Sequence, residues 1–287
     1  MKFDQKPYSR LVRQSSGHTH KFIKKLRYKE NESVHFILVH DADHKRSYNS
    51  SSIGSNHKQA IHLHKPLERM EKRIPQFKLY AYNNKSESVH LLTQNAIGYA
   101  VFMGINYGGT KDSDIKEIRA QFIDVDLNKI SERFDTLEEV WRKIKALRAN
   151  PAEQFQSLTI RKNKQGQYLF SAHRPIKQIQ KLKKKFLYKH WKQIRNTMIV
   201  ETNNGYHIYW IIAGGSINKF IPIQKALVRK FKADPAVTNL ARVMRIPGFF
   251  HMKNPKRPFL VRVIRWGRKK PFSQEELIKA LSLKPLL

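Results

Sequence analysis

Two aspartates, Asp124 and Asp126, stand one residue apart in an apolar run that extends from Phe122 to Leu127. Side chains two residues apart in a strand project from the same face, so both carboxylates would point one way while their apolar neighbours enter a core. Carboxylates held side by side repel each other unless a cation joins them, and hard oxygen ligands suit Mg²⁺ or Mn²⁺. The pattern predicts a divalent-metal site of the kind that handles phosphate groups. Taken alone, the motif is also compatible with an edge strand that carries two solvated acids.

The charge of the chain indicates an anionic partner. Lysine and arginine number 56 against 22 acidic residues, which gives a formal net charge of +34 over 287 residues. Such a balance favours phosphate backbones or anionic membrane surfaces. No apolar run approaches the roughly 20 residues of a membrane span, and the N-terminal residues lack the apolar region of a signal peptide. We therefore expect a cytoplasmic protein that binds nucleic acid and not a membrane.

Composition also limits the fold and the chemistry. Hydrophobic residues make up 40% of the chain, which is enough apolar material for a core. The chain has no cysteine, and this excludes disulfides, thiol nucleophiles and cysteine-ligated zinc. Residues 1–60 are polar and rich in lysine, histidine, serine and asparagine, and we expect a basic, partly disordered arm with one strand-like run at 34–39. Residues 61–287 are predicted to form the globular part.

The elements of this globular part mix without a regular alternation. Strand-like runs cover residues 77–82, 99–103, 122–127, 198–202, 206–212 and 259–264, with a further hairpin around Gln165 and Gly166. Helical patterns cover residues 67–74, a segment from Thr136 (with Glu139 as a capping box) to before Pro151, a segment with Pro222 in its first turn that ends near Asp234, and residues 273–281. This order predicts an α+β fold with an antiparallel or mixed sheet.

A dense basic helix is predicted within residues 151–197. Its cationic side chains are Lys177, Lys181, Lys183, Lys184, Lys185, Lys189, Lys192 and Arg195. Three aromatic residues, Phe186, Tyr188 and Trp191, are interleaved with them. These rings could anchor the helix on the core or stack on nucleic-acid bases, and we favour the anchoring role.

Further residues that could take part in catalysis or ligand binding follow in the second half of the chain. His207 stands near the head of a strand-like run, directly after the turn at 203–205, and Asp234 closes a predicted helix. Each has a structural explanation by itself, because a strand histidine commonly satisfies local hydrogen bonds. The box Arg-Val-Met-Arg-Ile-Pro-Gly-Phe-Phe-His-Met-Lys then occupies residues 242–253. The ordered set is more specific than any of its parts.

This set resembles the motifs of the archaeo-eukaryotic primase superfamily, in particular the RepB-like primases of plasmids and phages, across residues 65–267. In that family a strand with two aspartates supplies metal ligands, a short motif ending in histidine contacts the phosphates of the incoming nucleotide, and a later aspartate completes the metal site. The stretch from Asp234 to Phe249 is similar to the family's segment that runs from the third aspartate to an Arg-hydrophobic-Pro-Gly-Phe box. Residues 104–119 resemble the lead-in to the acidic motif.

The resemblance implies a primase-type catalytic core over residues 61–287, with an RRM-like antiparallel or mixed sheet flanked by helices and an N-terminal αβ unit. It implies a DNA primase or primase-polymerase, a nucleotidyltransferase that makes short primers on a single-stranded DNA template by two-metal phosphoryl transfer in plasmid or phage replication. NTPs or dNTPs would be substrates, Mg²⁺ or Mn²⁺ the cofactor, and a separate replicative helicase a further partner. The implied catalytic and metal-binding residues are Asp124, Asp126 and Asp234, and the implied nucleotide-binding residues are His207, Arg242, Arg245 and Lys253.

Two other classes of protein stay open. Residues 61–64, Ile-His-Leu-His, match the metal motif of HUH-type replication-initiator or relaxase nucleases, and Tyr188 with Lys192 matches their Tyr-X-X-X-Lys nucleophile pattern. Such an enzyme would form a covalent tyrosine adduct on single-stranded DNA. A non-enzymatic nucleic-acid-binding protein would use only its charge and its aromatic residues. Residues 40–44, His-Asp-Ala-Asp-His, also resemble a metal motif, and we interpret them as exposed polar sequence.

Overall fold

The computed structural model describes residues 17–29, 31–41, 61–66, 80–82, 88–96, 98–254 and 256–285. The chain divides into two compact units. The first unit comprises Met1–Asp124, Asn196–Asn203 and His207–Leu287, and the second comprises Val125–Arg195 and Asn204–Tyr206. The helix predicted at 67–74 and the start of the strand predicted at 77–82 lie outside the described residues.

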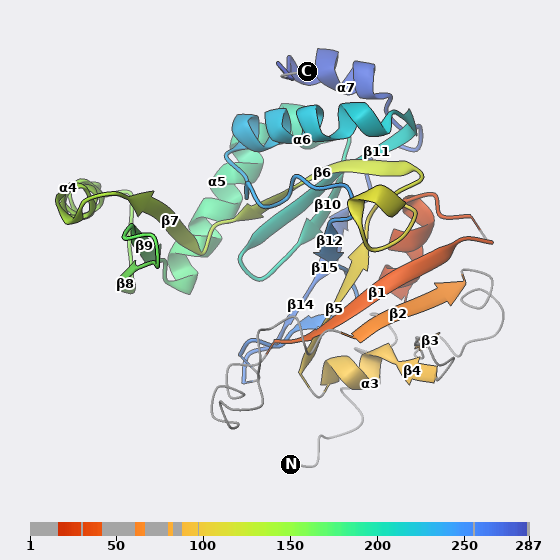
Figure 1. Cartoon of the computed structure of the whole chain (residues 1–287), viewed down its shortest axis with the longest axis horizontal. Helices are drawn as coiled ribbons and strands as arrows, with labels where there is room; N and C mark the ends of the chain where they lie inside the picture. Colours follow the sequence, from red (N-terminus) through yellow and green to blue (C-terminus); the bar gives the residue numbers. More distant parts are fainter. Residues whose placement is uncertain are drawn as a thin grey trace. The chain divides into compact units, whose positions relative to one another are not determined.

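A six-stranded sheet forms one part of the first unit, with the strand order β12-β5-β1-β2-β3-β4 (Figure 1). Its strands are β1 (Ser33–His40), β2 (Ile61–Pro66), β3 (Tyr80–Tyr82), β4 (Ser88–His90), β5 (Tyr99–Gly104) and β12 (Val243–Arg245). All of the neighbouring pairs are antiparallel. A short helix, α3 (Leu91–Ala96), leads from β4 towards β5. The sheet thus joins β12, which follows the third predicted aspartate, to strands from residues 33–104.

The predicted basic arm contributes to this sheet. Residues 17–25 are helical, and β1 lies between β2 and β5 with Val34, Phe36 and Leu38 buried on one face. The strand-like alternation at 34–39 was visible in the sequence, but its polar flanks suggested an arm. The part of residues 1–60 that the structure describes belongs to the first unit and supplies a central strand of its sheet, and residues 42–60 lie outside the described ranges.

A four-stranded sheet forms the other part, with the order β15-β10-β11-β6. Its strands are β6 (Ile118–Asp126), β10 (Met198–Glu201), β11 (Gly205–Gly215) and β15 (Arg262–Arg265). The predicted hairpin at 203–205 therefore connects adjacent strands. The single strand predicted at 259–264 is divided: β14 (Phe259–Leu260) pairs with β13 (Phe250–His251), whereas β15 pairs with β10. Two helices, α6 (Ile217–Phe231) and α7 (Gln274–Leu281), complete the unit, with a 3-10 turn at Asp112–Asp114.

Helix α6 begins earlier than the proline indicated. It starts at Ile217, so Pro222 lies inside the helix and not in its first turn. Proline lacks an N–H group, and the helix forgoes one main-chain hydrogen bond there. Burial of Phe220 and Ile223 on both sides of the proline offsets that loss. The final helix follows the prediction, because the Ser273 side chain accepts a hydrogen bond from the Glu276 N–H at 3.0 Å.

The second unit contains a three-stranded antiparallel sheet and two helices. The sheet has the order β7-β9-β8, with β7 (Lys129–Phe134), β8 (Ser157–Lys162) and β9 (Tyr168–His173). The helices are α4 (Leu137–Arg148) and α5 (Ile176–Ile194). Thr136 and Glu139 form the predicted capping box of α4, and Gly166 takes a φ of +83° in the predicted hairpin turn. A small core of Val140, Ile144, Phe170 and Ala172 joins α4 to the sheet.

These elements confirm the predicted α+β fold class. Helices and antiparallel sheets are present in both units, and no regular β-α-β alternation occurs among the elements that the structure describes. No helix in the described ranges is long and apolar enough to cross a lipid bilayer.

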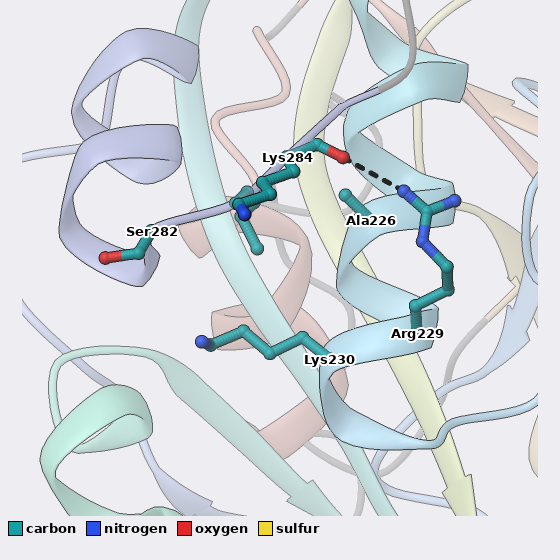
Figure 2. A pocket seen from close by; sticks show the side chains of 6 residues that line it. Ala226, Arg229, Lys230, Ser282 and Lys284 are labelled. Carbon is teal, nitrogen blue, oxygen red and sulfur yellow. Dashed lines mark hydrogen bonds between the residues drawn. The ribbon is translucent and has the colours of Figure 1, made fainter.

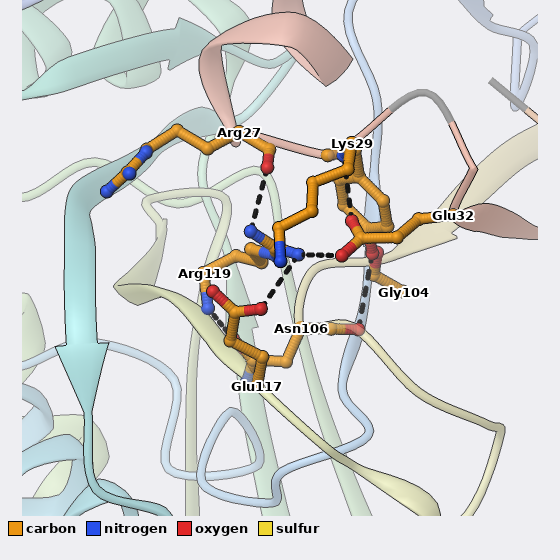
Figure 3. A network of polar contacts seen from close by, with 8 residues as sticks. Arg27, Lys29, Glu32, Gly104, Asn106, Glu117 and Arg119 are labelled. Atoms are coloured by element: carbon orange, nitrogen blue, oxygen red, sulfur yellow. Dashed lines mark hydrogen bonds and ion pairs between the residues drawn. The ribbon is translucent and has the colours of Figure 1, made fainter. Parts of the chain in front are cut away.

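A buried ion pair fixes the start of β6 (Figure 3). The Arg119 side chain is 3% exposed, and its guanidinium contacts the carboxylates of Glu32 and Glu117 and the carbonyl oxygen of Arg27. The ring of Tyr28 lies 5.5 Å from the guanidinium. Removal of a buried charge from water is costly, so these contacts must all be present together for the arrangement to hold. The segment before β1 is thereby tied to the strand that carries the two aspartates.

We predict that Glu32→Ala lowers the free energy of unfolding by about 3–5 kcal/mol, because Arg119 would keep a buried charge with a weaker counter-charge. Urea denaturation of the full chain measures this change. The matched control is Glu138→Ala, which removes the exposed i,i+4 pair with Arg142 and should change the stability very little. Equal effects of the two substitutions would contradict the structural role of the Arg119 pair.

Candidate active site

The two aspartates lie at the end of β6, as predicted. Ile123 and Val125 are buried, whereas the Asp124 side chain is 28% exposed and Asp126, the last residue of the strand, is exposed. One carboxylate oxygen of Asp126 accepts a hydrogen bond from the Asn128 N–H at 2.7 Å. The strand therefore presents both carboxylates outside the apolar core, which is the arrangement that the alternation predicted.

His207 lies beside Asp124 because β11 is the sheet neighbour of β6. Its Nε2 atom is 3.8 Å from a carboxylate oxygen of Asp124, and its Nδ1 atom is 3.3 Å from the hydroxyl of Tyr209. Burial lowers the pKa of His207 to about 3, and the cations of Arg245 and Arg242 act in the same direction, while a hydrogen bond to the main chain of Arg245 opposes them. The imidazole is therefore neutral, so a phosphate would meet a hydrogen-bonding group and not a charge.

Gly205 permits the close approach of the two chain segments at the start of β11. A Cβ atom at this position would lie 1.7 Å from the carbonyl oxygen of Val125. The N–H of Leu127 donates to the carbonyl oxygen of Asn204 at 2.9 Å. No side chain fits between main-chain atoms at such a separation, so the position requires glycine. This explains why a small residue stands two positions before the histidine.

Asp234 lies next to Asp124 although 110 residues separate them in the sequence. The Asp234 N–H donates to the carbonyl oxygen of Asp124 at 2.8 Å. One carboxylate oxygen of Asp234 accepts a hydrogen bond from the Ala236 N–H at 2.9 Å. The main chain therefore brings the first and third predicted ligands together, as the metal hypothesis requires.

The acidic side chains themselves are not gathered into a closed metal site. Within the described residues, no group of three or more histidine, aspartate or glutamate side chains is close enough to hold a metal ion. Asp126 and Asp234 each use one oxygen for a local N–H group, which leaves the second oxygen for another ligand. The donor types fit a hard divalent cation, and the main chain fits convergence of Asp124 with Asp234. Side-chain rotation is still needed to form the site.

Arg245 is held by a residue that the sequence analysis set aside. Its two terminal nitrogens donate to the two carboxylate oxygens of Asp41 at 3.0 and 3.1 Å, and its guanidinium lies 4.9 Å from the ring centre of Phe102. Asp41 also accepts the Met252 N–H at 2.8 Å, and the Nε2 atom of His251 is 3.6 Å away. The interpretation of Asp41 as exposed polar sequence was wrong. It comes directly after β1, and nothing local in the sequence indicated its distant partners.

The other two predicted nucleotide-binding residues are less constrained. Arg242 is half-buried, and its Nε atom has no hydrogen-bond partner among the described residues. A buried donor without a partner is costly, and a bound phosphate oxygen would remove that cost. Lys253 is exposed after β13. Within the described residues, the geometry thus leaves Arg242 with an open donor and Arg245 as part of a fixed bidentate pair.

Tyr209 is a site residue that the sequence analysis noted only as a neighbour on the same strand face. Burial raises the pKa of its hydroxyl well above the usual value, and the carboxylate of Asp124 adds to this effect. The hydroxyl therefore stays protonated and can donate to His207. The period-two spacing of His207 and Tyr209 on β11 was the available signal for this contact.

The residues of the nuclease alternative fall on different elements. His62 and His64 lie in β2 of the first unit, whereas Tyr188 and Lys192 lie on α5 of the second unit.

A hollow of about 280 Å³ lies elsewhere in the first unit, lined by Ala226, Arg229, Lys230, Ser282, Leu283 and Lys284 (Figure 2). Arg229 donates there to the carbonyl oxygen of Lys284 at 3.0 Å. The hollow contains none of the predicted site residues.

Residues 143–284 match the model of the RepB DNA-primase N-terminal domain family. Among solved structures, the chain is similar to the AEP domain of the cyanophage S-2L primase-polymerase, with 11% identity, a TM-score of 0.46, and coverage of 92% of this chain and 97% of that one. It is also similar to the primase RepB′, with 14% identity, a TM-score of 0.43, and coverage of 94% of this chain and 62% of that one. None of the curated proteins matches.

The family match defines the class of the second half of the chain as a primase-type domain. Residues 143–284 therefore carry a domain of the RepB primase type, and this match confirms the resemblance to RepB-like primases seen in the motifs. The matched residues include His207, Asp234 and the box at 242–253, and they begin after Asp124 and Asp126.

We predict that Asp41 and Arg245 are energetically coupled. Asp41→Ala and Arg245→Ala should each destabilise the chain, and the double variant should be more stable than the sum of the single effects implies, by about 1–3 kcal/mol. A double-mutant cycle from urea denaturation measures the coupling. Additive effects would show that the pair does not hold β12 to the end of β1.

Proposed function

We propose that this chain is a primase-polymerase that synthesises short primers on single-stranded DNA in the replication of a plasmid or phage. The observation that supports this most strongly is the approach of Asp124, His207 and Asp234, which come from three separate segments. Three motif residues of a nucleotidyltransferase that meet in space are better explained by a shared reaction than by three unrelated structural roles. The family match supports the same class of reaction.

In this proposal Asp124, Asp126 and Asp234 hold Mg²⁺ or Mn²⁺. A pair of such ions, when bound, activates the primer hydroxyl and neutralises the charge on the triphosphate and the departing pyrophosphate. Asp126 follows Asp124 by two positions on β6, so both carboxylates belong to the same face of the strand. The second oxygen of Asp234 completes the set.

In the same proposal, His207 and the residues around it bind the nucleotide. The neutral imidazole, oriented by Tyr209, would hydrogen-bond to a phosphate oxygen without adding charge. Arg242 would use its open Nε donor on the triphosphate, and the exposed Lys253 would reach the same group. Arg245 was predicted to bind the nucleotide in the same way, but its terminal nitrogens already bind Asp41. We therefore propose that Arg245 acts on the nucleotide mainly by fixing the segment that carries Arg242.

The partners follow from charge and chemistry. A net charge of +34 suits a DNA template that is bound through its phosphates with little base preference. NTPs or dNTPs are the proposed substrates, and a separate replicative helicase is the proposed source of single-stranded template. The proposed catalytic part need not begin at residue 61, because β1 (Ser33–His40) belongs to the same sheet as β12.

Replacement of any one metal-binding carboxylate should abolish synthesis. We expect Asp124→Ala, Asp126→Ala and Asp234→Asn each to lower primer synthesis at least a hundredfold, with the affinity for single-stranded DNA changed less than threefold. Labelled nucleotides, Mg²⁺ or Mn²⁺ and an unprimed template reveal the products, and anisotropy measures the binding. Asp135→Ala, which removes an exposed aspartate of the second unit, is the matched control and should retain activity. Normal synthesis by any one of the three variants would disprove the site.

The nuclease alternative has its own readout in the same reactions. It requires a covalent link between Tyr188 and DNA, which denaturing gels would detect. We expect no adduct and unchanged synthesis from Tyr188→Phe, which retains the ring.

His207 should affect nucleotide use more than template binding. We predict that His207→Ala raises KM for the nucleotide or lowers kcat by at least tenfold, while the affinity for single-stranded DNA stays within threefold. His207→Asn retains a hydrogen-bonding group and should recover part of the activity, because the native imidazole acts without charge. Equal losses of nucleotide use and template binding would count against the proposed contact.

A further inference from the structure

Helix α5 carries a continuous exposed stripe of cations and aromatic rings. The stripe consists of Lys177, Lys181, Lys184, Tyr188 and Trp191 on the helix, and Arg195 at its C-cap. Successive members are alternately four and three residues apart, and with 3.6 residues per turn this spacing places them on one side of the helix. At 1.5 Å per residue the stripe is about 27 Å long.

The two aromatic rings of the stripe are exposed, in contrast to the third ring of the helix. Tyr188 is 90% and Trp191 42% exposed, whereas Phe186 is buried and stacks on Tyr206 at a ring separation of 6.2 Å. Ile179 and Ile194 are also buried on the face of Phe186. The anchoring role favoured from the sequence therefore holds for Phe186, while Tyr188 and Trp191 are displayed to solvent.

The three lysines of the stripe have no counter-charge on their own helix. Helix α5 contains no acidic residue. Lys177, Lys181 and Lys184 have no acidic partner within the described part of the chain, whereas the buried Lys183 lies over the ring of Tyr206. Like charges along one side of a helix repel each other, so the fold bears a cost that an anionic ligand would remove.

We infer that this stripe is a binding surface for single-stranded nucleic acid, specifically the template strand, an inference that rests on the proposed function. Lysines that recur along a helix fit a run of phosphates, and exposed tyrosine and tryptophan provide platforms on which unpaired bases stack. Bases in a duplex are already stacked on each other and would leave the rings without a role. The combination of cations and rings therefore favours a single strand over a duplex.

The experiment measures binding of the full chain to a labelled single-stranded DNA oligonucleotide by anisotropy, without nucleotide or metal. Tyr188→Ala with Trp191→Ala should weaken binding about fivefold to 150-fold per ring, and should leave the dependence on salt unchanged. Tyr188→Phe with Trp191→Phe should restore most of the affinity. Lys181→Gln with Lys184→Gln should reduce the slope of log K against log salt by about 1.4, because each phosphate contact contributes roughly 0.7 for single strands.

The matched control is Lys225→Gln with Lys279→Gln, which removes the same charge from exposed positions on α6 and α7. It should leave the salt slope nearly unchanged. The proposed binding role of the stripe would be contradicted if the control lowered the salt slope equally. It would also be contradicted if the double alanine variant bound DNA within twofold of the wild type. Circular dichroism melting confirms that each variant is folded.

Three further arms decide the ligand. Equal weakening of duplex and single-strand binding in the alanine variant would overturn the single-strand assignment, and tighter binding of the matching RNA than of DNA would overturn the template assignment. Loss of binding to anionic phospholipid vesicles with unchanged DNA binding would indicate a membrane surface instead. If wild-type chain synthesises no primer but the stripe variants lose DNA binding, the proposed function fails and the stripe stands. If the wild-type chain synthesises primers and the variants bind DNA normally, the proposed function stands and the stripe fails.

Discussion

A main-chain contact between Asp234 and Asp124 brings the proposed metal ligands together. A hydrogen bond of 2.8 Å ties the loop after α6 to the strand that carries the paired aspartates. A main-chain bond fixes the positions of the two segments without using either carboxylate. The neighbouring strand β11 then places His207 at the same point, since Gly205 removes the Cβ atom that would collide with Val125. Convergence of the site is thus a property of the backbone.

The positive charges of Arg242 and Arg245 near His207 are also controlled by the structure. Arg242 and Arg245 both act on the buried His207 and favour its neutral form. Asp41 neutralises Arg245 through a bidentate pair, and the remaining cation, Arg242, retains an open donor. One arginine supports the main chain and the other is left to meet an anionic ligand. The Arg119 pair has a similar supporting role at the opposite end of β6.

Local patterns in the sequence predicted the parts of the fold that local physics determines. The alternation around Asp124 gave the strand and its two faces, and Thr136 and Ser273 marked helix starts that the structure confirms. Asp41 could not be found in this way, because its partners lie about 200 residues away and only the sheet brings them together. The predicted start of α6 was wrong because burial of the residues around Pro222 outweighed the usual preference of proline for the first turn of a helix. The burial of the aromatic residues on α5 depends on which side of the helix each one occupies, and Phe186 faces inward whereas Tyr188 faces solvent.

Iron(II)-mediated hydroxyl-radical cleavage tests the central claim most directly, because Fe²⁺ bound in place of Mg²⁺ cuts the main chain close to its ligands. We predict cuts near residues 124–126 and near residue 234 in the same molecule population, suppressed by excess Mg²⁺ and absent from Asp124→Asn. Cleavage at only one of these segments, or unchanged cleavage in the variant, would contradict the convergence of the three aspartates on a shared metal site.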